Sequence, residues 1–572
     1  MIKHRILFSS CTFYLITIVP CLAFKKTYSD TLIINPITFQ TPSPKGWNAQ
    51  YHTKVNFPVE RFSWRKIWME QTLKCDSMTN ADEFDCGSWD YIWDTMIIIP
   101  KEDTTEIFKI GSFVTPYGKG TDLGGEKGWK WMYDITDYYP LLSGEVGLIS
   151  GNNQELLDLK FIFIPGVPSR EVLDVKNIFP PGSIEDYPMN DRYSSMYRYG
   201  ALSADSVLKN TEIFLRSDAQ GFSIKAIISG HGHAGPDYCC EWADKMHYYW
   251  INGQKAFQWR IWKDCGNNPI YPQGGTWPYN RAGWCPGSKV DQHTFEITDF
   301  VEPGSLISID YRIQPVIDNR ESLGFYLMSH QLFSYGPPNF KNNAEIEYVY
   351  NPNSSDNTSR INPSLMGPKI LVKNSGLRII RNMKIIYGIM GNNLSTYRWS
   401  GVLDFLESEK ITLPIPSWSG ISDSKKFMIK IQSVNGRKDD NVSDNEYFTI
   451  VKIPQVLPNY FTVMLETNNL GRASENTLII KNIDEKVLFK LDSLEDSKIY
   501  TLPVSLNDGY YEMLFSDNNE NGIDRLWWKS NKDSIGTSGT IEILDKNNEK
   551  VIEFPSDFGQ EIRFPFIIGT IP

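Results

Sequence analysis

The chain has 572 residues, of which 57 are Lys or Arg and 68 are Asp or Glu, and its formal net charge is −11. This acidic balance argues against a nucleic-acid partner and is typical of an ordinary exported protein. The length far exceeds one hydrophobic core and indicates roughly three or four domains. The 17 Trp, 29 Tyr and 30 Phe residues, with 41 Gly and 33 Pro, favour a β-rich protein whose turns present aromatic surface.

The chain begins with a predicted signal peptide, residues 1–23. A basic stretch, Lys3-His-Arg5, precedes a mostly apolar run at 6–22, and a small-residue cleavage site ends at Ala23. We therefore expect a secreted or periplasmic protein. A single-pass anchor is less favoured because the run is short and broken by serine and proline. Lipidation at Cys21, which would make a surface lipoprotein, is less favoured because the preceding residues match a lipobox poorly.

Cleavage after residue 23 removes two of the eight cysteines and leaves six. An even number in an exported chain favours disulfides over free thiols or zinc ligands. Cys75 and Cys86 would close a short loop, and Cys265 and Cys285 are natural partners.

Residues 24–187 are predicted to form the first β domain. Within its last strand pattern the apolar residues Leu159, Phe161 and Phe163 alternate with other side chains, as in a half-buried strand. A loop at 75–90 lies between earlier strand patterns and ends in Gly-Ser-Trp-Asp. A disulfide in this loop would restrain the segment that carries Trp89 and Asp90.

Residues 188–342 are predicted to form a second β domain, which contains the most concentrated group of polar side chains. An alternating strand pattern at 222–228 leads into a loop with two histidines, two adjacent cysteines, Glu241 and Trp242. A carboxylate can bind a sugar hydroxyl or take a proton, while an indole face covers apolar ring C–H groups. The alternative is a disulfide-tied surface turn.

An aromatic loop at 265–285 carries Arg281 and Trp284 close to its end. Arg281 could orient a carboxylate or a substrate carbonyl through its planar guanidinium, or brace the loop through a salt bridge. The neighbouring aromatic residues favour the functional role.

Six motifs, in order and at similar spacing across about 50–335, resemble those of the bacterial peptide:N-glycosidase F family. They are Gly87-Ser-Trp-Asp-Tyr91, Ile110-Gly-Ser-Phe-Val-Thr-Pro-Tyr117, Asp134-Ile-Thr-Asp137 with Leu142-Ser-Gly144, Ile228-Ser-Gly-His-Gly-His233, Cys240-Glu-Trp242 and Arg281-Ala-Gly-Trp-Cys-Pro-Gly287. The resemblance implies two tandem eight-stranded antiparallel jelly rolls with the active site between them. It also implies hydrolysis of the amide that joins the innermost N-acetylglucosamine to asparagine. N-linked glycoproteins and glycopeptides would be the partners, and neither a metal nor another cofactor would be needed.

The motifs also assign residues. By resemblance, Asp90 matches the family's principal catalytic aspartate, and Glu241 matches a carboxylate that holds the first sugar and supports catalysis. The matching substrate-binding residues are Trp89, Trp242, Arg281, Trp284 and His233. Carboxylates together with an arginine can supply the base, the charge stabilisation and the proton that amide hydrolysis needs.

The sequence departs from the family pattern at several positions. Tyr91 replaces the arginine that usually follows the catalytic aspartate, and His231 replaces a tryptophan. The family's short disulfide cannot form in the usual way, and a vicinal Cys239–Cys240 bridge, although strained, is the expected alternative. A third family glutamate is expected near residue 153, where Glu155 is the nearest carboxylate.

Residues 343–572 lie outside the resemblance. Strand patterns predict an immunoglobulin-like or adhesion-type β domain at 343–455 and a last β domain at 456–572. Asp517-Asn-Asn-Glu-Asn-Gly522 matches half of a calcium loop, but the twelfth position is a tryptophan, so an Asn/Asp-rich turn is favoured. Because all matched motifs come earlier, the sequence predicts that a fragment of about 24–340 keeps activity. We expect a monomer.

Two alternatives from other classes remain. His231 and His233 could share a metal, and paired jelly rolls also occur in copper-dependent monooxygenases. The altered third carboxylate would also suit a catalytically silent glycan-binding or adhesion protein that keeps the aromatic cleft.

Overall fold

The structure of the protein is a computed structural model that describes residues 30–46, 49–59, 63–79, 83–102, 104–179, 196–233, 239–315, 324–418, 425–526 and 535–569. The predicted signal peptide, residues 1–23, lies outside the described residues. Among the helices of the described ranges, none is long and apolar enough to cross a membrane.

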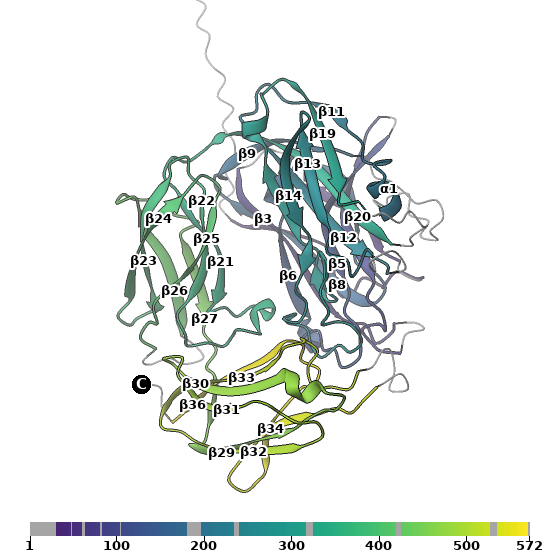
Figure 1. Cartoon of the computed structure of the whole chain (residues 1–572). Helices are drawn as coiled ribbons and strands as arrows, with labels where there is room; N and C mark the ends of the chain where they lie inside the picture. The colour runs from purple at the N-terminus through teal and green to yellow at the C-terminus, as the bar shows by residue number, and fades with distance from the viewer. Residues whose placement is uncertain are drawn as a thin grey trace, which may run out of the picture.

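The described chain is built from antiparallel sheets with one short parallel pair, so the predicted all-β fold class is confirmed. Along the chain, its strands form four successive two-layer units, each with its own hydrophobic core. Figure 1 shows the first two units packed together, the third unit to one side and the fourth unit, in yellow-green, below them.

The first unit is a sandwich of two sheets. One sheet has the order β1 (Leu32–Ile37), β8 (Glu155–Pro165), β3 (Trp64–Cys75) and β6 (Trp129–Asp134). The other has the order β5 (Thr105–Val114), β4 (Ile92–Pro100), β7 (Gly144–Ser150) and β2 (Tyr51–Phe57). Numbered along the chain, the sheets take strands 1-8-3-6 and 5-4-7-2, which is the connectivity of a jelly roll.

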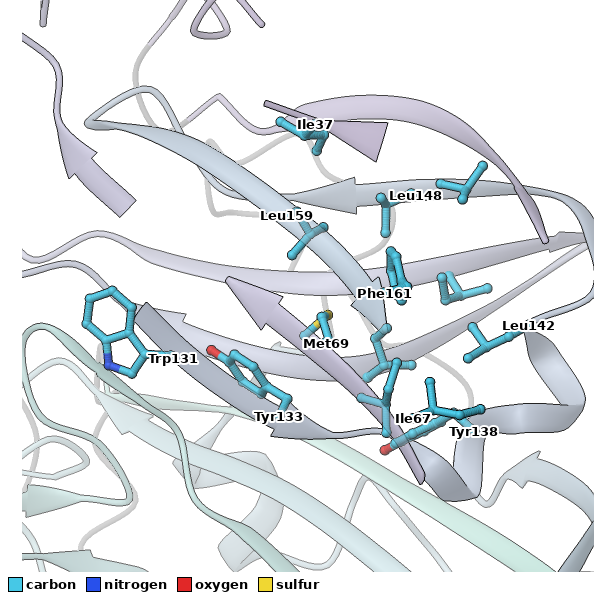
Figure 2. Packing of buried hydrophobic residues seen from close by; sticks show 14 of the residues in the cluster. Ile37, Ile67, Met69, Trp131, Tyr133, Tyr138, Leu142, Leu148, Leu159 and Phe161 are labelled. Atoms are coloured by element: carbon cyan, nitrogen blue, oxygen red, sulfur yellow. The ribbon is translucent and has the colours of Figure 1, made fainter. Parts of the chain in front are cut away.

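The core of this unit follows from strand alternation. Leu159, Phe161 and Phe163 on β8 are fully buried while their neighbours are partly exposed, as predicted, because successive side chains of a strand point to opposite faces. Figure 2 shows Leu159 and Phe161 beside Met69 of the adjacent strand β3. Each such apolar side chain contributes about 1.5–3 kcal/mol on burial, which fixes the two sheets that carry the loops described below.

The second unit repeats the jelly-roll connectivity. One sheet has the order β10 (Met196–Arg198), β20 (Phe325–Pro338), β12 (Gly221–His231) and β18 (Gln292–Glu296). The other has the order β11 (Thr211–Phe214), β19 (Leu306–Ile313), β13 (Met246–Ile251) and β14 (Gln254–Arg260). A short helix, α1 (Tyr199–Ser203), follows β10.

Two strands join the jelly rolls. β9 (Arg170–Asn177) pairs with β20, so the sheet of the second unit begins within the segment 24–187 that the sequence assigned to the first domain. In the other direction, β17 (Ser288–Lys289) pairs with β5 of the first unit. The loop at 265–287 therefore runs along the junction, where its side chains can meet loops of both units.

The third unit, residues 344–451, is a sandwich of seven described strands. One sheet has the order β21 (Ala344–Asn351), β22 (Lys369–Asn374) and β25 (Ser408–Thr412). The other has the order β24 (Ser395–Leu403), β23 (Ile380–Ile389), β26 (Lys426–Val434) and β27 (Glu446–Ile450). This arrangement resembles an immunoglobulin-like sandwich with its fourth strand on the second sheet.

The fourth unit, residues 455–569, is a larger sandwich. One sheet has the order β28 (Gln455–Leu457), β36 (Glu561–Ile568), β33 (Gly509–Asp517), β30 (Asn476–Asn482) and β31 (Val487–Leu491). The other has the order β32 (Ile499–Ser505), β29 (Tyr460–Glu466), β34 (Thr540–Leu544) and β35 (Lys550–Phe554).

The half calcium motif lies in the turn after β33. The Arg472 guanidinium donates hydrogen bonds to Oδ1 of Asn521 and to the main-chain oxygens of Asn521, Gly522 and Asp524. The cationic side chain of Arg472 therefore binds oxygens of the turn that carries the half calcium motif.

Candidate active site

Asp90 lies at the end of the loop that joins β3 to β4. A Cys75–Cys86 disulfide closes this loop. At Gly118 a side-chain Cβ would lie 2.1 Å from the carbonyl oxygen of Gly87, so the loop packs directly on the segment that follows β5. Backbone and side-chain hydrogen bonds between Tyr91 and Thr115, of 2.9 and 2.7 Å, fix the main chain next to Asp90.

The Asp90 carboxyl has a strongly perturbed pKa. Burial, and after it the negative charge of Glu241, raise the pKa to about 7, although Arg281 and a hydrogen bond from Tyr117 act to lower it. The residue as a whole is only partly buried. A carboxyl of this pKa can take up and release a proton near neutral pH, as a general base or acid requires.

Glu241 follows the vicinal Cys239–Cys240 disulfide. The carbonyl oxygen of Cys240 would lie 2.3 Å from a Cβ at Gly230, so this turn packs against the end of β12 where only glycine fits. The Glu241 amide donates to the Gly232 carbonyl at 2.9 Å, and its carbonyl accepts from the Ala282 amide at 3.0 Å. The backbone of Glu241 is thus held between β12 and β16 (Arg281–Ala282).

Arg281 is completely buried and fixes the Glu241 carboxylate. Its Nε donates to Oε1 of Glu241 at 3.0 Å. The two terminal nitrogens donate to the main-chain oxygens of Thr276 at 2.8 Å, Trp277 at 3.3 Å and Tyr279 at 2.7 Å. Arg281 has no exposed surface, whereas the substrate-binding role predicted from the sequence would require it to reach a ligand.

Two indole rings enclose the guanidinium. Cζ of Arg281 lies 4.3 Å from the ring centre of Trp242 and 4.9 Å from that of Trp284. Trp242 is partly exposed and can also face a ligand. Trp284 is only 1% exposed, and its indole N–H donates to the Gly230 carbonyl at 2.7 Å. Trp284 therefore packs against the Arg281 guanidinium inside the protein. Its burial does not suit the substrate contact predicted for Trp284 from the sequence.

A tyrosine connects Asp90 to this group. The Tyr117 hydroxyl is hydrogen-bonded to Asp90 and lies 3.3 Å from Oγ1 of Thr276. The same Thr276 oxygen accepts a hydrogen bond from Arg281 at 3.0 Å. Burial raises the pKa of Tyr117 well above its usual range, so the hydroxyl keeps its proton. The sequence placed Tyr117 in a matched motif but gave no role to it or to Thr276.

A pocket of about 860 Å3 is lined by Trp89 and Tyr91, the two residues that flank Asp90 in the chain, whereas Asp90 itself is not among the lining residues. The lining comes from the segments between β1 and β2, between β3 and β4 and between β7 and β8, and from the start of β8. Its residues are Phe39, Gln40, Thr41, Pro42, Ser43, Pro44, Lys45, Gly46, Asp76, Ser77, Met78, Trp89, Tyr91, Asn153, Gln154 and Leu156. Trp89 thus occupies a ligand-accessible wall, as a substrate-binding residue requires.

Residues 198–333 match a family model described as Peptide-N-glycosidase F, C terminal. The peptide-N(4)-(N-acetyl-beta-D-glucosaminyl)asparagine amidase F of Elizabethkingia miricola is 27% identical over 279 residues, which cover 46% of this chain and 72% of that protein. Over this region the chain is similar to the peptide:N-glycosidase F family. The resemblance found in the six sequence motifs is therefore confirmed.

Solved structures of the family are also similar. A crystal structure of this amidase at 2.2 Å resolution has 24% identity and a TM-score of 0.45, and the match covers 54% of this chain and 98% of that one. PNGase F from Flavobacterium meningosepticum has 25% identity and a TM-score of 0.44, with 54% and 96% covered. PNGF-II has 18% identity and a TM-score of 0.40, with 53% and 65% covered.

Glu155, expected to replace a third carboxylate of the peptide:N-glycosidase F family, does not line the pocket. It is 2% exposed and pairs across the sheet with Cys75. Because side chains alternate along β8, Leu156 faces the pocket while Glu155 points to the opposite side. The polar side chains of this segment that line the pocket are those of Asn153 and Gln154. Asp90 and Glu241 are not lining residues either, so a role for Glu155 stays a prediction.

The two histidines of the glycine-rich turn lie in different surroundings. His231 is buried, hydrogen-bonds Ser229 at 2.8 Å and stacks on Trp284, and burial lowers its pKa to about 3. His233 is exposed. Across the ranges that the structure describes, no group of three or more His, Cys, Asp or Glu side chains could hold a metal ion. The residues present therefore do not form the histidine cluster that a copper centre would require.

Proposed function

We propose that the protein is an exported amidase that hydrolyses the amide between the innermost N-acetylglucosamine and asparagine of N-linked glycoproteins and glycopeptides. Water adds to the carbonyl carbon, the carbon–nitrogen bond breaks, and asparagine becomes aspartate while a glycosylamine leaves. The main support is the Asp90 carboxyl, whose pKa is about 7 and whose charge interacts with that of Glu241. The buried Arg281 in turn holds the Glu241 carboxylate by a hydrogen bond.

Asp90 is the proposed catalytic base. As a carboxylate it accepts a proton from the attacking water, and as the resulting acid it can return this proton to the leaving nitrogen. The Tyr117 hydroxyl keeps its proton and donates a hydrogen bond to Asp90. This hydrogen bond orients the Asp90 carboxyl. Asp90 alone can therefore carry the proton from the attacking water to the leaving nitrogen.

Glu241 is proposed to bind the first sugar. Arg281 occupies one carboxylate oxygen, which leaves the other to accept from a sugar hydroxyl, and the partly exposed Trp242 ring can cover the apolar face of the same sugar. Trp89 and Asn153 line the pocket on the other side of Asp90 and are proposed to contact the rest of the substrate. His233 remains a proposed cleft residue.

The proposal includes export through the signal peptide at residues 1–23, a monomeric state and no metal requirement. Disulfides in the described part of the chain, Cys75–Cys86, Cys239–Cys240 and Cys265–Cys285, suit an oxidising compartment.

The test is mass spectrometry of a denatured N-glycopeptide incubated with the protein in water enriched in ¹⁸O. We expect free glycan and a peptide in which asparagine has become aspartate with one heavy oxygen. Intact glycopeptide after prolonged incubation with folded protein would refute the amidase proposal.

A silent glycan-binding protein is the second candidate, and the absence of a carboxylate from the wall formed by Asn153 and Gln154 favours it. In that case the same glycopeptide binds, as calorimetry would detect, but its mass does not change.

A further inference from the structure

The fourth unit packs directly on the loop at 265–285 of the second jelly roll. The Gln560 amide donates to the Gly266 carbonyl at 2.9 Å, and the side chains of Asn267 and Gln560 are hydrogen-bonded. A Cβ at Gly559 would lie 2.4 Å from that same Gly266 oxygen, so the two backbones are in the closest contact that glycine allows. Figure 1 shows this unit below the jelly rolls.

Asp557 is the centre of this contact. Its Oδ1 accepts from the indole N–H of Trp277 at 2.7 Å, and its Oδ2 accepts from the amides of Gly274 at 2.7 Å and Gln273 at 3.2 Å. Trp277 is fully buried and Asp557 nearly so. Such charge-assisted bonds to a buried carboxylate are among the strong ones, so three donors of the loop are fixed to one side chain of another unit.

The same stretch of loop holds Arg281. The main-chain oxygens of Thr276, Trp277 and Tyr279 accept from the guanidinium, and Thr276 lies between Gly274 and Trp277, which Asp557 fixes. On its other side Thr276 contacts Tyr117 and through it Asp90, and Gln273 accepts a hydrogen bond from the Tyr117 amide at 3.1 Å. A shift of this stretch would therefore displace both proposed catalytic carboxylates.

The third unit supports the same junction. Arg360 donates to the Asn268 carbonyl of the loop at 2.7 Å and to the carbonyls of Phe558 and Glu561 of the fourth unit at 2.8 and 2.7 Å. This buried guanidinium thus bridges the loop to the segment that carries Asp557.

We propose that the fourth unit is a built-in positioning element of the active site, and that Asp557 is the positioning residue through which it sets Arg281 and Glu241. Asp557 touches no reacting atom and acts through the loop. The inference rests on the proposed amidase function and deepens it. A fragment of about 24–340 lacks Asp557 and Arg360, so the activity predicted for it from the motif positions is not expected.

The test compares full-length wild type with Asp557→Asn, which keeps the size of the side chain but replaces an acceptor oxygen with a donor that faces N–H groups. We expect kcat on a glycopeptide to fall about 10- to 100-fold with KM changed less than about threefold, because misplacement of catalytic groups by about 1 Å is sufficient for such a loss. Hydrogen exchange should accelerate in 266–280 while β33 and β36 stay protected. Asp492→Asn, an exposed carboxylate of the same unit, is the matched control and should behave as wild type.

Trp277→Phe is the second variant, because it removes one donor and leaves the charge of Asp557 in place. If Asp557→Asn does not fold, a lowered kcat and faster loop exchange in Trp277→Phe support the inference, and unchanged values refute it. If folded Asp557→Asn keeps both the wild-type kcat and the wild-type exchange in 266–280, the inference is overturned. A wild type that releases no glycan refutes the proposed function instead, while the exchange experiment still decides whether Asp557 orders the loop.

Discussion

Nε of Arg281 donates to Oε1 of Glu241 at 3.0 Å, although Arg281 itself has no exposed surface. A buried guanidinium is stable only when its charge and its N–H groups are satisfied, and here main-chain oxygens of the loop and one carboxylate do this. The Glu241 side chain is therefore held in one orientation. The partly exposed Asp90, by contrast, is left with a pKa close to neutrality.

The first prediction concerns Asp90→Asn. The amide keeps nearly the same shape but cannot take a proton from water, so kcat should fall about 10²- to 10⁴-fold while KM changes little. Steady-state kinetics on a glycopeptide measures this, with folding checked by circular dichroism. Asp85→Asn, an exposed carboxylate of the same loop, is the control and should keep wild-type activity. A folded Asp90→Asn protein with near-wild-type kcat would remove Asp90 from the mechanism.

The second prediction concerns pH. Because the Asp90 carboxylate is the proposed base and its pKa is about 7, kcat/KM should rise with pH and level off above about 7. The folded-state pKa lies above the unfolded value of about 3.9, so the protonated form stabilises the fold and this stability is lost as pH rises from about 4 to 7. Asp90→Asn should therefore melt about 2 °C or more above wild type at pH 8, and the difference should narrow by pH 5. Equal melting temperatures at pH 8 would contradict the raised pKa.

Local sequence patterns predicted much of the two jelly rolls. The alternation of Leu159, Phe161 and Phe163 defined a strand whose buried face the structure confirms, because a period of two is a property of the backbone itself. The matched motifs also indicated that Asp90 and Glu241 belong to one site, and in the structure the charge of Glu241 acts on Asp90.

The rest depended on contacts that no local pattern records. Asp557 and Trp277 are 280 positions apart in sequence, and nothing around Asp557 indicates that an indole of another unit donates to it. For Glu155, closeness in sequence to the expected position did not indicate the face on which its side chain lies, since a shift of one residue along a strand turns a side chain to the other face.

The third prediction follows from this change of face. Asn153→Ala should raise KM several-fold or change the discrimination between plain and core-fucosylated glycopeptides, because Asn153 lines the pocket. Glu155→Gln should leave that discrimination unchanged, since the side chain points away. Kinetics of the two variants on both substrates checks this. A specificity change in Glu155→Gln alone would restore Glu155 as the third carboxylate.

The fourth prediction is that activity persists in EDTA, because the proposed proton transfers use Asp90 and the proposed sugar contact uses Glu241. Initial rates should be equal with and without chelator, after dialysis long enough to remove a bound ion. Loss of activity that copper or zinc restores would support the metal-dependent alternative.

The last prediction tests whether Arg281 and Glu241 act as one unit. Lysine cannot reproduce the planar fork that donates to Glu241 and to three main-chain oxygens, so Arg281→Lys should lower kcat/KM at least tenfold and destabilise the second jelly roll. Glu241→Gln should lower kcat and also raise KM, because the carboxylate is proposed to bind the first sugar.

If Arg281 acts only through Glu241, the double variant should be little worse than Glu241→Gln alone, with a coupling free energy of about 0.5–3 kcal/mol in kcat/KM. Arg216→Lys is the control, since Arg216 forms an exposed ion pair with Asp218 far from any buried carbonyl, and its activity should not change. Strictly additive losses in folded proteins would mean that Arg281 contributes separately, by direct contact with the substrate in a conformation that exposes its guanidinium.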